Sequence, residues 1–333
     1  MPARVVSQQR KFWRVAGAFG ERLAEASGKL RLAADEGAEW PAVGDWVSVE
    51  LRGAGGVAVI RTVLSRRNRF IRKSPGKKVE EQVIAANVDT ALVMSALDGD
   101  FNPRRVERYL AQCWESGVRP VLILNKADVC ENTRGLEAEM RRVALATPVF
   151  VISARTGQGI EEFKPLFVPG NTIVLLGSSG VGKSTLTNRL LGQSLQKVKG
   201  VRANDSRGQH TTTARELFDL PCGALLIDTP GLRELQLWDA DEGLTRAFAD
   251  INLLAAQCRF NDCRHQAEPG CAVQAALCTG TLDLARLENH RKLLREQAFL
   301  RQKIDPEARS EQKQRIKRLT RKAREIYRHK RPD

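Results

Sequence analysis

The sequence predicts a multidomain protein with an N-terminal OB-like β-barrel, a central α/β domain and a mostly helical C-terminal region. Residues 1–66 contain short alternating apolar runs divided by glycine and aspartate turns, which is typical of a small barrel. Residues 67–250 alternate strand-like and helix-like segments, which indicates a mostly parallel sheet. Residues 251–300 look helical around a cysteine-rich loop, and 301–333 predict a basic helical tail.

The predicted barrel is rich in aromatic side chains. It contains Phe12, Trp13, Phe19, Trp40 and Trp46. Exposed aromatic rings can stack on bases, whereas buried rings would fill the core of a barrel this small. The sequence leaves both interpretations open.

The central domain is expected to be built from short strands and the helices that connect them. We predict strands over 88–97, 118–124, 149–152, 172–176 and 224–227, and helices over 102–116, 160–167 and 184–191. In parallel sheets of this kind, ligands bind at the carboxyl ends of the strands. The motifs that follow these strands are therefore the candidates for chemistry.

A glycine-rich loop follows the predicted strand 172–176 and precedes the helix 184–191. Its pattern, Gly-x4-Gly-Lys-Ser, brings backbone N–H groups together around phosphate oxygens, and the helix N-terminus favours negative charge. Lys183 is expected to reach the β- and γ-phosphates, and Ser184 to ligate Mg²⁺. The loop consists of Gly177, Ser178, Ser179, Gly180, Val181, Gly182, Lys183, Ser184 and Thr185.

A guanine-reading motif ends the predicted strand 118–124. It consists of Asn125, Lys126, Ala127 and Asp128. The Asp128 carboxylate can accept hydrogen bonds from N1–H and the exocyclic amine of guanine, a donor pair that adenine lacks. Asn125 would brace the loop and the Lys126 stem would cover the ring. A backbone amide of Ser153 or Ala154 would face the guanine oxygen.

The motifs occur in a rotated order along the chain. In an ordinary GTPase the phosphate loop comes first and the guanine motif last, but here the guanine motif precedes the phosphate loop. Asp228-Thr229-Pro230-Gly231 comes last. Asp228 is expected to hold Mg²⁺ through water, and the Gly231 N–H to sense the γ-phosphate. The order predicts a circularly permuted P-loop GTPase domain that binds GTP with Mg²⁺.

The residue that orients the attacking water is not the usual one. Many GTPases place a glutamine after the last glycine of this motif, but Leu232 stands there. His210 lies where the first switch loop belongs and is our catalytic candidate, although a solvated loop histidine is an equally simple interpretation from the residues alone. A neighbouring threonine, Thr212 or Thr213, is expected to complete the Mg²⁺ site with Ser184 and Asp228.

A compact metal-binding pattern follows in the C-terminal region. Its candidate ligands are Cys258, Cys263, His265 and Cys271. Three thiolates and one imidazole complete a tetrahedral Zn²⁺ site and leave no position for water, which predicts one structural zinc. Unpaired cytosolic cysteines are the alternative, although this density of cysteines disfavours it.

The net charge predicts a polyanionic partner such as nucleic acid, and two separate basic clusters suit a large RNA surface. The formal net charge is +15, and basic residues cluster in 61–78 and 301–333. A generally basic surface is the simpler alternative. No apolar run is long enough to span a membrane, and residues 1–10 lack a signal core, so we expect a cytoplasmic protein.

Together these motifs resemble one family, the bacterial small-ribosomal-subunit-dependent GTPases (RsgA/YjeQ). The resemblance covers nearly the whole chain, including 43–47, 81–89, the permuted motifs, 208–213 and the cysteine spacing. It implies binding to the small ribosomal subunit and its rRNA late in assembly, near the decoding region. It also implies GTP hydrolysis stimulated by the subunit and coupled to release of the factor. The resemblance favours a catalytic role for His210.

Two other functions compete with this interpretation. One is an RNA-binding scaffold whose nucleotide is mainly structural, which Leu232 would suit. The other is an ATP-driven RNA remodeller, which Asp128 disfavours because adenine offers no donor pair. We expect a monomer that binds GTP and GDP.

Overall fold

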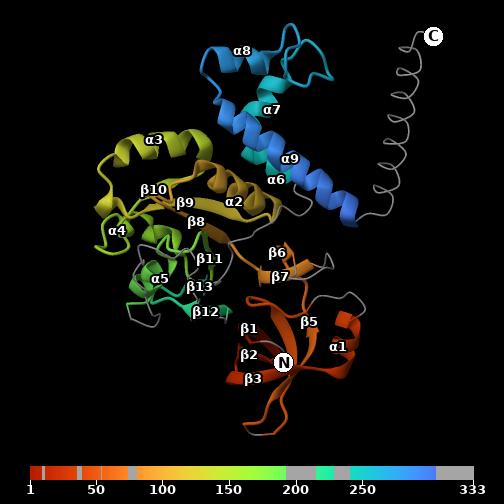
Figure 1. Cartoon of the computed structure of the whole chain (residues 1–333). Helices are drawn as coiled ribbons and strands as arrows, with labels where there is room; N and C mark the ends of the chain where they lie inside the picture. The colour runs from red at the N-terminus through yellow and green to blue at the C-terminus, as the bar shows by residue number, and fades with distance from the viewer. Residues whose placement is uncertain are drawn as a thin grey trace, which may run out of the picture.

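The computed structural model describes residues 1–9, 12–35, 40–53, 55–73, 81–192, 215–228 and 241–304. The described elements form three regions that follow one another along the long axis of the molecule (Figure 1). The N-terminal barrel lies at one end, the α/β domain in the middle and the helical C-terminal region at the other end. The predicted three-part fold is therefore confirmed.

The N-terminal region is a five-stranded barrel. Its elements are β1 (Pro2–Gln9), β2 (Phe12–Gly17), β3 (Gly20–Ala26), α1 (Gly28–Asp35), β4 (Trp46–Glu50) and β5 (Ala58–Val63). The strand order is β1-β2-β3-β5-β4, and β4 pairs back onto β1 to close the barrel. Because β3 pairs with β5 in parallel, the chain must cross between them, and α1 lies in this connection.

The aromatic residues of the barrel divide between core and surface. Trp13 is buried, stacks on Trp40 with ring centroids 5.9 Å apart, and donates its indole N–H to the Pro41 carbonyl at 2.8 Å. Phe12 and Trp46 are about half exposed, at 52% and 45%. Strand alternation explains the split between Phe12 and Trp13, since successive side chains point to opposite faces.

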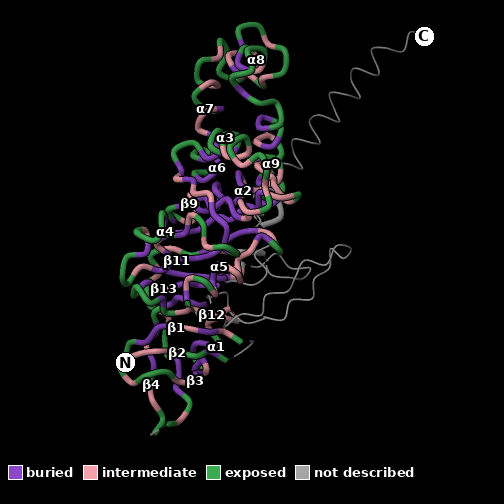
Figure 2. Tube along the Cα trace, turned by 90° about the vertical axis from the view of Figure 1, so that its left-hand side faces the viewer, coloured by how far each residue is buried: buried purple, intermediate pink, exposed green. Residues whose placement is uncertain are grey.

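The central sheet continues from the barrel without a break. Its strands are β8 (Thr90–Ala96), β9 (Arg119–Asn125), β10 (Val149–Val151), β11 (Thr172–Gly177), β12 (Arg215–Asp219) and β13 (Leu225–Asp228). They lie in the order β10-β9-β8-β11-β13-β12, parallel except for β12, and β12 pairs with β1 of the barrel. Buried residues concentrate in β8, β9, β11 and β13, the inner strands of this domain (Figure 2). Because β8 and β11 are buried along their whole length, they read as continuous apolar runs in the sequence.

Helices cover the central sheet. They are α2 (Pro103–Glu115), α3 (Thr133–Ala144), α4 (Ile160–Phe163) and α5 (Lys183–Leu191), with 3₁₀ turns at Ala127–Val129 and Lys164–Leu166. Asn102 caps α2 by accepting a hydrogen bond from the Arg105 N–H, and Pro103 occupies the first turn, as predicted. The predicted helix 160–167 is wrong in its second half: α4 ends at Phe163, and the 3₁₀ turn that follows contains Pro165, which has no N–H to continue the α-helical pattern.

A two-stranded hairpin, β6 (Arg69–Lys73) and β7 (Glu81–Ala86), links barrel and central domain. It is not continuous with the large sheet. Phe70 of this hairpin is fully buried, and the Gln112 side chain of α2 donates to the Ile71 carbonyl at 3.1 Å. Part of the basic cluster at 61–78 therefore lies on strands that pack against the central domain.

The C-terminal region is helical around a cysteine-rich loop, as predicted. It comprises α6 (Asp241–Ala247), α7 (Ala249–Ala255), α8 (Ala272–Cys278) and α9 (Leu284–Ile304). The long helix α9 runs from the cysteine-rich end back alongside α6 and α2 (Figure 1). Within the described residues, no helix is both long and apolar enough to cross a membrane. The predicted tail beyond Ile304 lies outside the described residues.

Candidate nucleotide site and metal centre

The phosphate loop connects β11 to α5 at the centre of the sheet. β11 ends at Gly177, and α5 begins at Lys183 behind the N-cap residue Gly182. The Lys183 ammonium donates to the carbonyls of Gly177 and Ser178, both at 2.7 Å. Gly182 has φ +102°, and a Cβ there would lie 2.2 Å from Asn125 Nδ2, so glycine is required. The loop therefore folds around the Lys183 ammonium, and its Gly182 lies against Asn125 of the guanine motif.

Asn125 joins three loops of the site. It ends β9, is almost fully buried, and donates from Nδ2 to the Val181 carbonyl of the phosphate loop at 2.8 Å. Its Oδ1 accepts from the Ala154 N–H at 2.8 Å. The amide is therefore used on both sides, which agrees with the bracing role expected for Asn125. The same bond holds the Ser153–Ala154 segment against the guanine motif.

The Asp128 carboxylate, which we predict to read guanine, is held by two neighbours. Ser153 donates its hydroxyl to Asp128 Oδ1 at 2.6 Å, and the Arg155 guanidinium donates from Nε to Oδ2 at 2.8 Å. The hydrogen bond from Ser153, followed by the contact with Arg155, holds the pKa of Asp128 below its ordinary value. The carboxylate is therefore ionised at neutral pH and acts only as an acceptor, as guanine recognition requires.

Some site residues were missed by reasoning from the sequence. Arg155 follows the predicted Ser153–Ala154 pair directly, so its basic side chain was a signal that could have been used. Asp98 and Asp100 lie in the loop between β8 and α2, which has no standard motif. Asp98 binds the Lys126 ammonium at 2.6 Å, and Asp100 accepts the Ser178 hydroxyl hydrogen bond. They stand where the strand β8 ends, at the same edge as the other nucleotide motifs.

Asp228 is the last residue of β13 and is mostly buried. β13 lies parallel to β11, so Asp228 and the phosphate loop follow neighbouring strands at the same edge of the sheet. Ser184 and Thr185 lie in the first turn of α5. Four further predicted positions fall outside the described residues: His210, Thr212, Thr213 and Gly231. Their predicted roles stay predictions.

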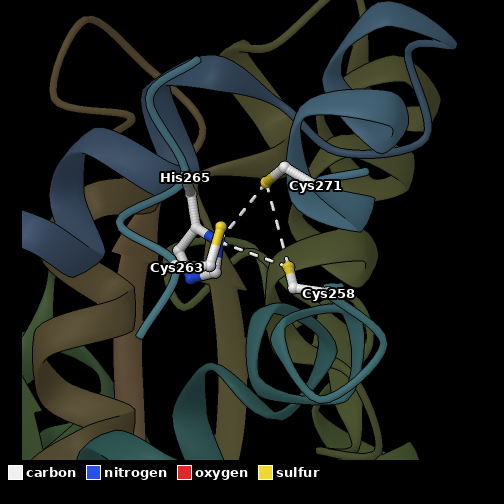
Figure 3. Close-up of side chains that lie close together, drawn as sticks. All are labelled: Cys258, Cys263, His265 and Cys271. Carbon is white, nitrogen blue, oxygen red and sulfur yellow. Dashed lines mark hydrogen bonds between the residues drawn. The ribbon is translucent and has the colours of Figure 1, made fainter. Parts of the chain in front are cut away.

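The four predicted zinc ligands converge. Their donor atoms all lie within 4.8 Å of one another, with Cys258 and Cys271 sulfurs 3.8 Å apart and each 3.5 Å from His265 Nδ1 (Figure 3). A tetrahedral zinc with typical bond lengths separates two sulfurs by about 3.8 Å, and a sulfur from a nitrogen by about 3.5 Å. The cluster is therefore compatible with Zn²⁺.

The backbone around this cluster is also organised to hold it. His265 has φ +58°, and its carbonyl accepts hydrogen bonds from the Gln274 side chain and from Arg291 of α9. Glu268 accepts three backbone N–H bonds within the loop, which lowers its pKa to about 2. Cys271 caps α8 through its sulfur. Four protein donors are present, so a tetrahedral Zn²⁺ held here would have no position left for a catalytic water.

These observations define the class of protein. The strand that carries the phosphate loop, β11, lies between β8 and β13, with β9 and its Asn125–Asp128 motif one strand further on. The fold and the loops are those of a P-loop GTP-binding domain, with chain order rotated relative to the ordinary arrangement. The protein is thus a circularly permuted GTPase with an OB-like barrel and a candidate zinc module.

Comparison with known proteins gives the particular family. A family model described as RsgA GTPase matches residues 63–238. A small ribosomal subunit biogenesis GTPase RsgA of Opitutus terrae is 50% identical over 315 residues, covering 92% of this chain and 86% of the relative. A second such protein, from Lactiplantibacillus plantarum, is 44% identical over 296 residues, covering 89% and 83%. The chain belongs to the RsgA GTPase family.

Solved structures agree in fold. The crystal structure of YjeQ from Thermotoga maritima has a TM-score of 0.64 and 27% identity, covering 89% of this chain and 98% of that one. YloQ, described as a circularly permuted GTPase, has a TM-score of 0.60 at 22% identity and covers 89% and 94%. This second likeness concerns the fold alone. Both likenesses support the fold described above.

Proposed function

We propose that the protein hydrolyses GTP to GDP and phosphate in the cytoplasm while bound to the small ribosomal subunit. Hydrolysis is stimulated by the subunit, and it releases the factor late in subunit maturation. The observation that supports the proposal is the pair of hydrogen bonds by which Asn125 joins the guanine motif to the Ser153–Ala154 segment and to the phosphate loop. The names of the relatives supply the process, since they are small ribosomal subunit biogenesis GTPases.

At the base end of the pocket, Asp128 accepts from the guanine edge and the Lys126 stem covers the ring. The support is the ionised, pinned carboxylate between Ser153 and Arg155. At the phosphate end, loop N–H groups and Lys183 bind the phosphate oxygens. Gly231 senses the γ-phosphate in this proposal.

Water attacks the γ-phosphorus while GDP departs, and His210 orients that water because Leu232 cannot. Ser184, Asp228 and a threonine, Thr212 or Thr213, hold Mg²⁺, which neutralises the charge of the phosphates when bound. Zinc held by the cysteine–histidine cluster is structural and keeps the C-terminal loop folded.

The proposed partner surface is ribosomal RNA. The formal net charge of +15 predicts strong attraction to a phosphate backbone and binding that weakens steeply with salt. Phe12 and Trp46 on the barrel surface are available for stacking, and the Arg4 guanidinium lies 5.3 Å from the Trp46 ring centroid. We propose that a monomer uses 1–66 and 251–300 to hold the subunit, while 67–250 binds nucleotide and 301–333 is an accessory basic tail.

The test is GTP and ATP turnover by the purified protein, with and without small ribosomal subunits. Stimulation of GTP hydrolysis alone, lost in His210→Ala while GTP binding persists, is the expected result. Lys183→Ala is the matched site variant and should lose nucleotide binding or turnover. Negligible GTP turnover both with and without the subunit would contradict the proposal and favour the competing scaffold function, in which the nucleotide is structural.

A further inference from the structure

Two aspartates stand beside the nucleotide pocket without an assigned role. Asp98 and Asp100 lie in the loop that joins β8 to α2, at the edge of the sheet where the nucleotide loops gather. A carboxylate next to bound phosphates repels them unless its charge is compensated. Both carry compensation: Asp98 pairs with Lys126 at 2.6 Å, and Asp100 pairs with Arg105 at 2.8 Å. Their negative charge is therefore balanced by these cations. The contacts of each carboxylate with the nucleotide loops then indicate what it does.

Asp98 acts on the base end of the pocket. Its Oδ2 binds the Lys126 ammonium, and its Oδ1 accepts the Asp100 N–H at 3.0 Å, so the carboxylate is fixed on both sides. Burial tends to raise the pKa of Asp98, but the hydrogen bond and charge of Lys126 together with the Asp100 N–H outweigh it, and the pKa lies below its ordinary value. Lys126 has a long side chain with many rotamers, so its position is fixed only when the ammonium at its end is anchored. Asp98 is that anchor.

Asp100 acts on the phosphate end. It accepts a hydrogen bond from the Ser178 hydroxyl, and the carbonyl of the same Ser178 accepts from the Lys183 ammonium at 2.7 Å. Arg105, in the first turn of α2, contacts both Asp100 oxygens at 2.8 Å and holds the carboxylate in place. A displacement of Asp100 would therefore shift Ser178, and with it one of the carbonyls that aim Lys183.

We propose that Asp98 and Asp100 are positioning residues that set the two lysines of the pocket, Lys126 directly and Lys183 through Ser178. This rests on the proposed GTPase function and adds a fourth loop, the β8–α2 loop, to the nucleotide site. The two residues act at opposite ends of the nucleotide. Loss of Asp98 weakens binding of GDP and GTP alike, whereas loss of Asp100 affects mainly steps that involve the γ-phosphate.

The experiment compares Asp98→Ala, Asp100→Ala and Asp100→Asn with the wild-type protein and with Glu161→Gln. Glu161 is an exposed carboxylate of the same domain that pairs with Lys164, so it controls for the loss of a negative charge. Dissociation constants are measured for GDP and for a non-hydrolysable GTP analogue, and kcat and KM for GTP in the presence of small subunits. Thermal unfolding without nucleotide and circular dichroism show whether each variant is folded.

We expect Asp98→Ala to weaken both nucleotides by roughly tenfold, the effect of losing one charge-assisted hydrogen bond. Asp100→Ala should lower kcat by roughly tenfold and bind the GTP analogue worse relative to GDP. Asp100→Asn should recover most of kcat, because its amide oxygen still accepts from Ser178. A role in folding alone would instead change the unfolding temperature and leave the GTP-to-GDP ratio unaltered.

A double-mutant cycle tests the route through Ser178. Ser178→Ala should reproduce the Asp100→Ala defect, and the double variant should be no worse than either single variant. Fully additive losses would overturn the Ser178 route, and variants that match Glu161→Gln would overturn the whole inference. Both results are distinct from failure of the proposed function, in which the wild-type protein itself would neither bind nor hydrolyse GTP.

Discussion

The N-terminal barrel keeps a hydrophobic core of its own, whereas the C-terminal module shares its core with the central domain. Eleven buried residues, among them Trp13 and Ile60, form a separate cluster inside the barrel. The candidate zinc ligand Cys271 and the α9 residue Leu293 belong instead to the cluster that contains α2 and one face of the central sheet. The same GTPase domain therefore carries one neighbour that can fold around itself and one that depends on it.

The barrel is joined mainly through backbone and polar contacts. β1 pairs with β12 through Ser7 and Gln8, and the Arg4 side chain reaches across to the Thr172 hydroxyl at 2.7 Å. Of the described barrel residues, only Val43, in the turn before β4, belongs to the buried core of the central domain. Gly44 of this turn accepts the Arg4 Nε–H at its carbonyl.

The C-terminal joint is a buried ion network on α2. The Glu107 carboxylate is fully buried and is bound by Arg286, Asn289 and Arg104. Arg286 also contacts Asp250 of α7 at 2.7 Å and lies over the Phe248 ring at 4.9 Å from its centroid. Burial tends to raise the pKa of Glu107, so this carboxylate stays charged only while its cations remain.

The two joints lead to different ends of the pocket. In the barrel, β1 pairs with β12, and β12 pairs with the strand β13 that ends in Asp228. The C-terminal module packs against α2, and the loop before α2 contains Asp98 and Asp100. Binding of the barrel to a partner would thus bear on the Asp228 side, and binding of the zinc module on the lysine-positioning side. Perturbing one joint at a time should separate these effects.

Removal of zinc should cause the largest loss of stability. This loss should be confined to the C-terminal module and the central domain. A structural zinc supplies much of the folding free energy of a short loop, and here its ligands pack against the shared core. Cys263→Ser or a strong chelator should unfold the segment around 258–278 and lower the unfolding temperature of the central domain. Hydrogen exchange should show little change in the barrel. Equal loss of protection in barrel strands would contradict the separate core.

Arg286→Met should destabilise the C-terminal joint by about 3 kcal/mol, because it leaves the buried Glu107 carboxylate with fewer cationic partners. Urea unfolding measures the change. Arg295→Met is the matched control, since Arg295 lies on the same helix but is exposed. If both substitutions cost the same, the ion network does not hold the joint.

Gly44→Ala should disrupt the barrel joint by about 2 kcal/mol or more. Gly44 has φ +91°, and a Cβ there would stand 2.2 Å from the Ala86 carbonyl oxygen. The control is Gly20→Ala, at φ +80°, where the added methyl group would meet no atom within 4 Å and the cost is backbone strain alone. The difference in stability between the two variants, measured by thermal unfolding, gives the cost of the contact with the Ala86 carbonyl. Similar losses in both would mean that Gly44 is needed only for its backbone conformation.

What the sequence could predict was local in the chain. The phosphate loop, the Asn125–Asp128 motif and the cysteine–histidine spacing are short patterns, and each takes its chemistry from neighbours a few residues away. The buried strands β8 and β11 were also readable, because their apolar runs are uninterrupted. The fold class followed from these elements and from the order of the motifs.

What it could not predict depends on residues far apart in sequence. Glu107 and Arg286 each look like ordinary charges on helix surfaces, and no spacing rule links them across 179 positions. The same holds for Arg4 with Thr172 and for the β1–β12 pairing. Asp98 and Asp100 were overlooked because acidic residues are not expected beside phosphates until their cationic partners are seen. The helix α3 was missed, since only its last turns are buried.

The smallest predicted effect is a pH dependence of the C-terminal joint. His290 lies 4.7 Å from Phe248 between ring centroids, and burial, followed by the charge of Arg286, lowers the pKa of His290 to about 4. The native histidine therefore stays neutral at a pH where the unfolded chain, with a pKa of about 6.5, takes up a proton. The contribution of neutral His290 to stability is present above a pH of about 6.5 and is lost as the pH falls toward about 4. We expect this loss to be about 2 kcal/mol, after allowance for the partial exposure of the ring.

Comparison with His290→Gln isolates the contribution of the histidine. The carboxylates titrate in both proteins, so their effect cancels in the stability difference. The stability difference between wild type and variant, measured by urea unfolding at several pH values between about 7 and about 4, should shrink or reverse in acid. Parallel curves would show that His290 is as exposed in the native joint as in the unfolded chain. Because the barrel joint is built from Arg4, a backbone ladder and the Val43 turn, Gly44→Ala should not alter this histidine-dependent slope, which makes the slope a probe of the shared core alone.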